Sequence, residues 1–259
     1  MESAERRPVT AVVISFNEKE RIAACLESIA WADEIVVVDS GSTDGTREIA
    51  RGYTPNVFEI PWRGFGPQKQ AAVDLAKHDV ILNVDCDERV TQELSREIGS
   101  VLSGDGMLAG YSVPRRTFLG KKEIRHSGWY PDRTIRLFDR RRARYSDAAV
   151  HERVIVEGET GSLRHPLLHY SFSDVSDLFR KMERYTDLSA RAMFEDGRRC
   201  RPSDLAIRPV LAFLKAYLLR RGFLDGPEGL VVGVAGAVHV FTKYAKLREL
   251  ERSSSETPP

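Results

Sequence analysis

The stretch EIVVVDSGSTDGT, residues 34–46, joins an apolar run to a turn of glycine and small polar residues. Residues 35–38 are apolar without alternation, which is typical of a strand buried on both faces. The run ends on Asp39, and the turn that follows favours the start of a helix. This stretch therefore predicts a strand and then a helix of a parallel sheet.

The same order recurs on both sides of that stretch. The runs TAVVISF (10–16) and DVILNV (79–84) have the length and composition of buried strands, and residues 18–30 and 67–77 have helical character, with Asn17 as the expected N-cap of the first helix. Strands that alternate with helices predict an α/β fold with a mostly parallel central sheet and helices on both faces. Ligands bind beyond the carboxyl ends of such strands. We therefore expect Asn17, Asp39 and Asp85 to line one crevice.

The pattern changes after a helix expected at residues 91–102. Shorter and more polar strands follow, and from residue 173 the sequence is helical, with a single apolar stripe and Ser173 as a possible cap. We expect one α/β domain over residues 1–170, with halves at about 9–103 and 104–170, then a helical extension over 171–250 and a disordered tail over 251–259. The stripe consists of Val175, Leu178, Phe179, Met182, Tyr185, Leu188 and Ala192.

Composition limits the class of protein. The 39 Lys and Arg residues nearly balance 38 Asp and Glu residues, so we expect no nucleic-acid partner. Cys25, Cys86 and Cys200 form no CxxC pair, which favours a reducing compartment. The charged N-terminus has no secretory signal pattern. These features predict a cytoplasmic protein.

The C-terminal region is basic. Residues 198–248 contain ten Lys or Arg residues and three acidic residues, and ten minus three gives an excess of seven positive charges. The apolar stretch 229–241 is shorter than the roughly 20 residues that a helix needs to cross a bilayer. We expect these helices to lie on an anionic membrane surface; packing on the α/β domain or a homodimer contact are the alternatives. The expected inward residues are Phe213, Leu214, Tyr217, Leu218 and Phe223, with Arg208, Lys215, Arg220 and Arg221 near the headgroups.

The DCD sequence at residues 85–87 is a candidate metal site. In an extended segment Asp85 and Asp87 point the same way while Cys86 points back. Two carboxylates favour a hard cation, Mg²⁺ or Mn²⁺, which usually bridges protein and phosphate oxygens. The simpler interpretations are a solvated turn at DCD and a helix-capping role for Asp39 and Asp44.

Four segments together resemble glycosyltransferase family 2, which has the GT-A fold: VVISFNE (12–18), ADEIVVVDSGSTDGT (32–46), PQKQAAVDLA (67–76) and VILNVDCDERV (80–90). The later GWYPDRTIRLFDRRRARYSDAAVHERV (128–154) and GFLDGPEG (222–229) are similar to its lipopolysaccharide core β-glucosyltransferase branch. The resemblance extends from about Val9 to Leu250.

The resemblance implies a site for a UDP-sugar in the first half of the α/β domain and an acceptor site in the second. Asp85 would contact the ribose or the sugar, and Asp87, with Asp85, would bind the divalent cation that neutralises the diphosphate. Gln68 and Lys69 would lie near the base or the diphosphate. The residues implied to hold the uridine are Phe16, Asn17, Glu18 and Asp39.

A family member that inverts the anomeric centre needs a base for the acceptor hydroxyl. Glu152 and Asp147 are the candidates, and we prefer Glu152 because it precedes a strand and adjoins His151. His151 would orient Glu152 or approach the metal. Asp132 is a third candidate base. The alternative for His151 and Glu152 is a surface ion-pair cluster with Arg144 and Arg153, and His169 is either a further ligand or a structural histidine.

The resemblance therefore implies an inverting, metal-dependent enzyme that transfers glucose from UDP-glucose to a lipopolysaccharide inner-core heptose, peripherally at the inner face of the cytoplasmic membrane. One alternative is a family 2 transferase for another acceptor, such as a polyprenyl-linked sugar, a capsule precursor or a peptide. A second is a catalytically silent scaffold that binds nucleotide sugars.

Overall fold

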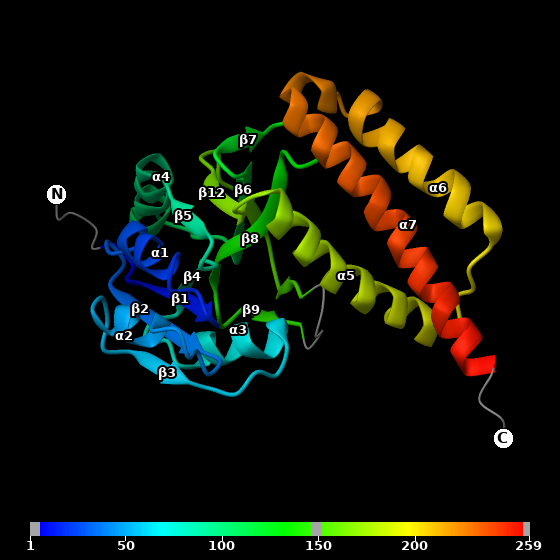
Figure 1. Cartoon of the computed structure of the whole chain (residues 1–259). Helices are drawn as coiled ribbons and strands as arrows, with labels where there is room; N and C mark the ends of the chain where they lie inside the picture. Colours follow the sequence, from blue (N-terminus) through cyan, green and yellow to red (C-terminus); the bar gives the residue numbers. More distant parts are fainter. Residues whose placement is uncertain (1–5, 147–151, 256–259) are drawn as a thin grey trace. The chain divides into compact units, whose positions relative to one another are not determined.

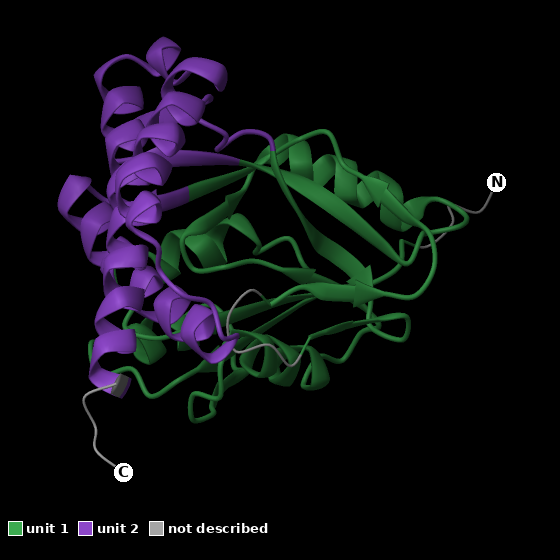
Figure 2. Cartoon of the chain, turned by 90° about the vertical axis from the view of Figure 1, so that its right-hand side faces the viewer, with its two compact units in different colours: residues 1–115, 132–169 green, residues 116–131, 170–259 purple. Residues whose placement is uncertain are grey.

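The computed structural model describes residues 6–146 and 152–255. The chain divides into two compact units, shown in different colours in Figure 2. Unit 1 comprises residues 1–115 and 132–169, and unit 2 comprises residues 116–131 and 170–259. The chain passes between the units three times: within strand β6 (Gly110–Leu119), at residues 131–132, and within strand β12 (Leu167–Phe172).

Unit 1 contains the predicted parallel strands, in the spatial order β3-β2-β1-β4. All three pairings among these strands are parallel, and Ser15 lies opposite Asp39 in the register of β1 and β2. The expectation of an α/β sheet with parallel strands is confirmed for this half (Figure 1). The strands are β1 (Val9–Ser15), β2 (Glu34–Asp39), β3 (Val57–Glu59) and β4 (Val80–Asn83), and the helices between them are α1 (Ile22–Ser28), α2 (Thr46–Arg51) and α3 (Phe65–Asp74).

Most of the remaining strand pairs of unit 1 are antiparallel. β8 (Asp132–Asp139) pairs with β4, and β6 pairs with β8. Because Leu137 lies opposite Leu82, this pairing brings the middle of β8 beside the end of β4. β5 pairs with β12, β11 pairs with β6, and β9 and β10 form a separate two-stranded sheet. The bounds of these elements and of the remaining helix are β5 (Glu88–Val90), α4 (Gln92–Ser103), β9 (Ala143–Tyr145), β10 (Val154–Val156) and β11 (Thr160–Ser162).

Two apolar clusters cover the two faces of the sheet. Val9, Ala11 and Val13 of β1 point into one cluster with residues of α1 and α4, whereas Val12 points into the other with residues of α3. This alternation follows from the period of two along a strand. Helices therefore pack on both faces, as expected.

Two helix starts differ from the sequence prediction. α1 begins at Ile22 and not at residue 18, because Asn17 has a left-handed backbone (φ 53°) and its side chain accepts a hydrogen bond from Thr43 N instead of capping a helix. Asp174 and not Ser173 caps α5, since the Asp174 side chain accepts a 2.7 Å hydrogen bond from Asp177 N.

Unit 2 contains the ends of β6 and β12, strand β7 (Lys122–Ile124) and the C-terminal helices. α6 and α7 lie side by side (Figure 1), joined by a π-helical turn and a 3-10 turn. The helices are α5 (Val175–Glu195), α6 (Pro202–Leu214), the π turn η1 (Lys215–Leu219), the 3-10 turn η2 (Gly222–Asp225) and α7 (Pro227–Ser255).

The structure modifies two expectations for this unit. The predicted apolar stripe of α5 is largely exposed: Leu178 is buried, but Val175, Phe179, Tyr185 and Leu188 are not, because the buried face turns toward Ala190 and Met193. Residues 251–255 belong to α7 and not to a disordered tail.

The helix that contains the apolar stretch 229–241 is also longer than that stretch. Within the helix at Pro227–Ser254, an 18-residue window has a mean hydropathy of 1.3, so by length and composition alone this helix could cross a membrane.

Candidate active site

The carboxyl ends of β1, β2 and β4 meet at one edge of the sheet. β1 lies between β2 and β4, so the residues that follow each of these strands are neighbours. The expected convergence of Asn17, Asp39 and Asp85 on this edge is confirmed.

Asp39 organises the turn after β2. Its buried carboxylate accepts hydrogen bonds from the Ser15 and Ser42 hydroxyls at 2.7 and 2.6 Å, and from the backbone N–H groups of Gly41 and Ser42 at 3.0 and 2.7 Å. Four donors satisfy the charge without a helix cap. The structure thus shows Asp39 shaping the loop, and its contact with a uridine stays a prediction.

The loop after β1 is tied to the same turn. Asn17 N donates to Ser42 Oγ at 2.8 Å, and Glu18 N donates to Thr46 Oγ1 at 2.9 Å. Phe16 stands at this edge with 56% of its surface exposed. The two loops form one polar rim with an accessible aromatic ring.

Gln68, on α3, reaches this rim from the side. Its Nε2 donates to Ser40 Oγ and to Ile60 O at 3.1 and 2.9 Å. Its Oε1 is buried and has no hydrogen-bond partner among the described residues. A buried acceptor without a donor is costly, so this oxygen is an unsatisfied polar group beside the rim.

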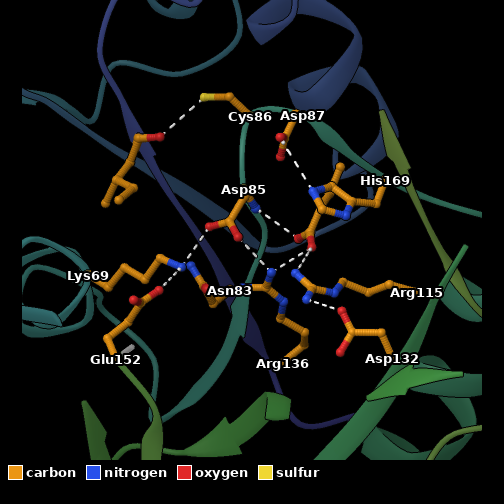
Figure 3. Close-up of polar contacts among 12 residues, drawn as sticks. Lys69, Asn83, Asp85, Cys86, Asp87, Arg115, Asp132, Arg136, Glu152 and His169 are labelled. Carbon is orange, nitrogen blue, oxygen red and sulfur yellow. Dashed lines mark hydrogen bonds and ion pairs between the residues drawn. The ribbon is translucent and has the colours of Figure 1, made fainter. Parts of the chain in front are cut away.

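Asp85 is held between two buried cations (Figure 3). Lys69 Nζ lies 2.9 Å from Asp85 Oδ1, and Arg136 Nη2 lies 2.6 Å from Asp85 Oδ2. Arg136 is 3% exposed and also donates to Asn83 Oδ1 at 2.6 Å and to Glu88 Oε1 at 2.5 Å. The negative charge at the end of β4 is therefore neutralised by the protein itself.

The pKa values of these groups follow from burial and pairing. Burial raises the pKa of Asp85, but Arg136 and Lys69 outweigh it and bring that pKa well below its usual range. Burial lowers the pKa of Lys69, but Asp85 more than reverses this and raises it. Burial raises the pKa of Tyr145 to about 12. At neutral pH Asp85 is ionised, Lys69 is protonated and Tyr145 keeps its hydroxyl proton, which it donates to Asn83 Oδ1 at 2.7 Å.

Asp87 has a different environment. His169 Nε2, on β12, lies 3.4 Å from Asp87 Oδ2, and Figure 3 shows the two side chains facing one another. Cys86 points away, with its Sγ 3.2 Å from Ile14 O, but residues 86 and 87 form a turn and not the extended segment that the sequence predicts. Asp85 and Asp87 therefore contact different partners. Within residues 6–146 and 152–255 no group of three or more His, Cys, Asp or Glu side chains is placed to hold a metal ion.

Glu152 is joined to the same network. Its Oε1 lies 3.0 Å from Lys69 Nζ, so one ammonium group contacts both Asp85 and Glu152. Its partner is thus a buried lysine of α3 and not the surface arginines of the alternative interpretation. Asp147 and His151 lie outside the described residues. Asp132 pairs with Arg115.

These side chains enclose a cavity of about 140 Å³ within unit 1. The polar groups around it combine four basic residues with two carboxylates. The basic residues are Lys69, Arg115, Arg136 and Arg153, the carboxylates are Asp85 and Glu152, and Tyr145 adds a hydroxyl group.

Arg115, Arg136 and Tyr145 were not singled out in the sequence. One signal could have identified Arg136: it interrupts the apolar run of TIRLF (134–138), and a buried arginine requires an acidic partner. The other residues lie in ordinary polar or amphipathic contexts. Their role depends on how β8 and β9 pack.

The chain forms a mixed α/β sheet with charged side chains gathered at the ends of its parallel strands, and comparison with known proteins shows the family to which it belongs. Residues 10–155 match the model of glycosyl transferase family 2, so the chain belongs to this family. It is a glycosyltransferase with the GT-A fold, and the resemblance seen in its motifs is confirmed.

Two relatives are similar in sequence to this chain over most of its length. It is 32% identical to the lipopolysaccharide core biosynthesis glycosyltransferase LpsC of Rhizobium meliloti, over 93% of this chain and 92% of LpsC. It is 30% identical to an uncharacterized glycosyltransferase of Rickettsia typhi, over 96% of this chain and 89% of that protein. A solved glucosyl-3-phosphoglycerate synthase from Mycobacterium tuberculosis, in complex with Mg²⁺ and UDP, is 25% identical over 44% of each chain, with a TM-score of 0.34.

Proposed function

We propose that this glycosyltransferase transfers a hexose, glucose from UDP-glucose, with inversion to a hydroxyl of a lipopolysaccharide inner-core heptose. The observation that carries the proposal is the contact of Lys69 with both Asp85 and Glu152 in a chain of family 2. It brings a candidate donor-binding carboxylate and a candidate base to one ammonium group. The acceptor class is supported by the similarity to LpsC, whose name places it in lipopolysaccharide core biosynthesis.

The nucleotide is proposed to bind at the rim formed by the loops after β1 and β2. The exposed ring of Phe16 offers a flat face to the uracil. The unpartnered Oε1 of Gln68 can accept a hydrogen bond from a ligand N–H or hydroxyl. Asn17, Glu18 and Asp39 keep the two loops in the conformation that presents these groups.

A divalent cation fits Asp87 better than Asp85. Asp85 already neutralises Lys69 and Arg136, whereas Asp87 faces the imidazole of His169. Mg²⁺ is commonly held by one or two carboxylates together with substrate phosphates, so a small protein donor set is sufficient. When bound, the ion would stabilise the negative charge of the departing UDP. His151, outside the described residues, stays an alternative ligand.

Glu152 is the proposed base. It would take the proton of the acceptor hydroxyl as that oxygen attacks the anomeric carbon. Lys69, which stays protonated, holds the Glu152 carboxylate at the cavity and keeps Asp85 ionised on its other side. Asp147 is the alternative base.

A lipid-linked acceptor requires the enzyme to work at a membrane surface. We place it peripherally at the inner face of the cytoplasmic membrane. Two alternatives to this function differ in what they share with it. A transferase for another lipid-linked acceptor would use the same donor site, whereas a catalytically silent scaffold would bind the nucleotide sugar without transferring it.

The test is UDP release from a panel of UDP-sugars with Mg²⁺ or Mn²⁺, with and without truncated lipopolysaccharide core in detergent. We expect acceptor-dependent release with UDP-glucose. Release should fall at least about 100-fold in Asp87→Asn and in Glu152→Gln. The matched controls are Asp105→Asn and Glu157→Gln, two exposed carboxylates of unit 1.

Binding measurements separate the roles. Glu152→Gln should bind UDP with metal as the wild type does, because it removes only the base. Normal turnover in Glu152→Gln, with loss in Asp147→Asn, would show that the base assignment is wrong. UDP binding without release from any donor or acceptor would favour the silent scaffold.

A further inference from the structure

We infer that the hairpin of α6, η1, η2 and α7 inserts an apolar stripe into one leaflet of an anionic bilayer and lies in the plane of its interface without crossing it. This hairpin lies within unit 2 (Figure 2). The inference depends on unit 2 alone and holds whichever reaction unit 1 performs. The outer stripe consists of Ile207, Val210, Leu211, Leu214, Leu218 and Leu219.

The outer stripe is exposed along its whole length. Leu219 is 79% exposed, Val210 and Leu211 are each 56% exposed, and Leu214, the least exposed member, is still 39% exposed. The spacing from Ile207 through positions 210, 211, 214 and 218 places these side chains on one face of a continuous helical segment. A contiguous apolar surface of this kind marks a membrane or protein contact.

The opposite face of α6 and η1 is used to hold the hairpin together. Phe213 and Tyr217 stack at 5.2 Å between ring centroids. Both lie against Gly233 of α7, where a Cβ atom would be 3.3 Å from the Phe213 ring and 3.4 Å from Tyr217 Cβ. Because the inner face packs so closely on α7, the outer stripe has no partner within the hairpin.

α7 extends the apolar surface. Leu230, Val234 and Phe241 are 44%, 43% and 49% exposed. Only 22% of the most apolar window of this helix is buried. Apolar exposure on both helices favours a bilayer over a narrow groove on a partner protein.

The exposed charges beside the stripe favour anionic headgroups. Lys215, Arg220 and Arg221 are exposed at the turn between the helices. Asp225, in the same turn, is buried and accepts hydrogen bonds from His126 N at 2.8 Å and Arg125 N at 3.2 Å. Long basic side chains can keep their charges at the headgroups while their stems lie along apolar surface.

The same charges argue against a membrane-spanning orientation. If α6 and α7 crossed the bilayer, the basic turn would have to pass through the apolar core to reach the far side, which is costly. α7 also contributes Val232, Ala235 and Leu247 to the packed interior of unit 2, and Lys246 forms a 2.6 Å ion pair with Asp187 of α5. Crossing a bilayer would break these contacts, whereas lying in the interface retains them.

The test is flotation of the full chain with vesicles of phosphatidylglycerol and phosphatidylethanolamine. We expect Leu211→Glu/Leu219→Glu to lower the vesicle partition coefficient at least about tenfold, because each change places a charge in the inserted stripe. The control is Tyr53→Glu/Leu75→Glu, which alters two exposed apolar residues of unit 1 and should change partition less than twofold. Circular dichroism melting confirms that each variant is folded.

Insertion depth is measured with a fluorophore that reports polarity. In a Cys200→Ser background, Leu219→Cys carries the label, while Cys25 and Cys86 are buried and stay unlabelled. Vesicles should shift its emission to the blue, and brominated lipids should quench it. A label at Tyr53→Cys should show neither effect.

Three results would overturn the inference. Vesicle binding that about 1 M salt abolishes, and that Leu211→Glu/Leu219→Glu leaves intact, would show electrostatic adsorption only. A dimer that the double variant dissociates, without vesicle binding by the wild type, would make the stripe a contact between copies. Resistance of membrane-bound protein to alkaline carbonate would show that α7 spans the bilayer.

Discussion

Lys69 Nζ lies 3.0 Å from Glu152 Oε1, although the two residues are 83 positions apart in the chain. Lys69 is on α3, and Glu152 precedes β10, so the contact joins the parallel half of unit 1 to its antiparallel half. Lys69 is also 5% exposed and pairs with Asp85. It is therefore the residue through which the two candidate functional carboxylates are coupled.

Lys69→Met should lower turnover at least about 100-fold, because Glu152 would lose the contact that orients it as a base. Steady-state UDP release at saturating donor and acceptor measures this effect on kcat. Lys77→Met removes an exposed lysine shortly after α3 and should leave turnover unchanged. Near-normal kcat in Lys69→Met would refute an orienting role.

Arg136→Met should destabilise the protein by about 3–5 kcal/mol, because Asp85 and Glu88 would lose a buried cationic partner. Urea unfolding monitored by circular dichroism gives the change in the free energy of unfolding. Arg144→Met removes an exposed arginine of β9 and should cost less than about 0.5 kcal/mol. Equal stabilities of the two variants would contradict the role assigned to Arg136.

His169→Ala and Asp87→Asn should each weaken Mn²⁺ binding in the presence of UDP at least about tenfold, if these two side chains hold the ion. Isothermal titration of Mn²⁺ into the UDP-bound protein measures the affinity without any turnover. His78→Ala is the control, at a histidine located before β4. Loss in Asp87→Asn alone would remove His169 from the donor set.

Glu123 should make stability depend on acid pH. Hydrogen bonds from Arg116 lower the pKa of Glu123 to about 2, so its folded pKa is below the unfolded value of about 4.3. The stabilising contribution is then complete above the unfolded pKa and is lost as the pH falls toward 2.

The measurement is the free energy of unfolding of wild type and Glu123→Gln between pH 7 and about pH 2. We expect the difference between them to be constant near neutral pH and to shrink below about pH 4. A difference that does not change with pH would show that Glu123 has an ordinary pKa in the folded protein.

The sequence by itself determined the elements and the edge of the sheet where the site forms. The apolar runs before Ser15, Asp39 and Asn83 have a local signature, because residues buried on both faces of a strand are recognisable without knowledge of their neighbours. Parallel strands must place their carboxyl ends together, so the convergence of Asn17, Asp39 and Asp85 follows from the order of the elements. The family motifs are likewise local.

Only the tertiary structure decided which partners these residues have. Arg136 reaches Asp85 across 51 positions of sequence, and His169 reaches Asp87 from β12, because of strand pairings that no local pattern encodes. The sequence likewise does not reveal which face of α6 is exposed. An apolar stripe has the same spacing whether it faces a core or the outside, and the close packing of Phe213 on Gly233 determines which stripe remains uncovered.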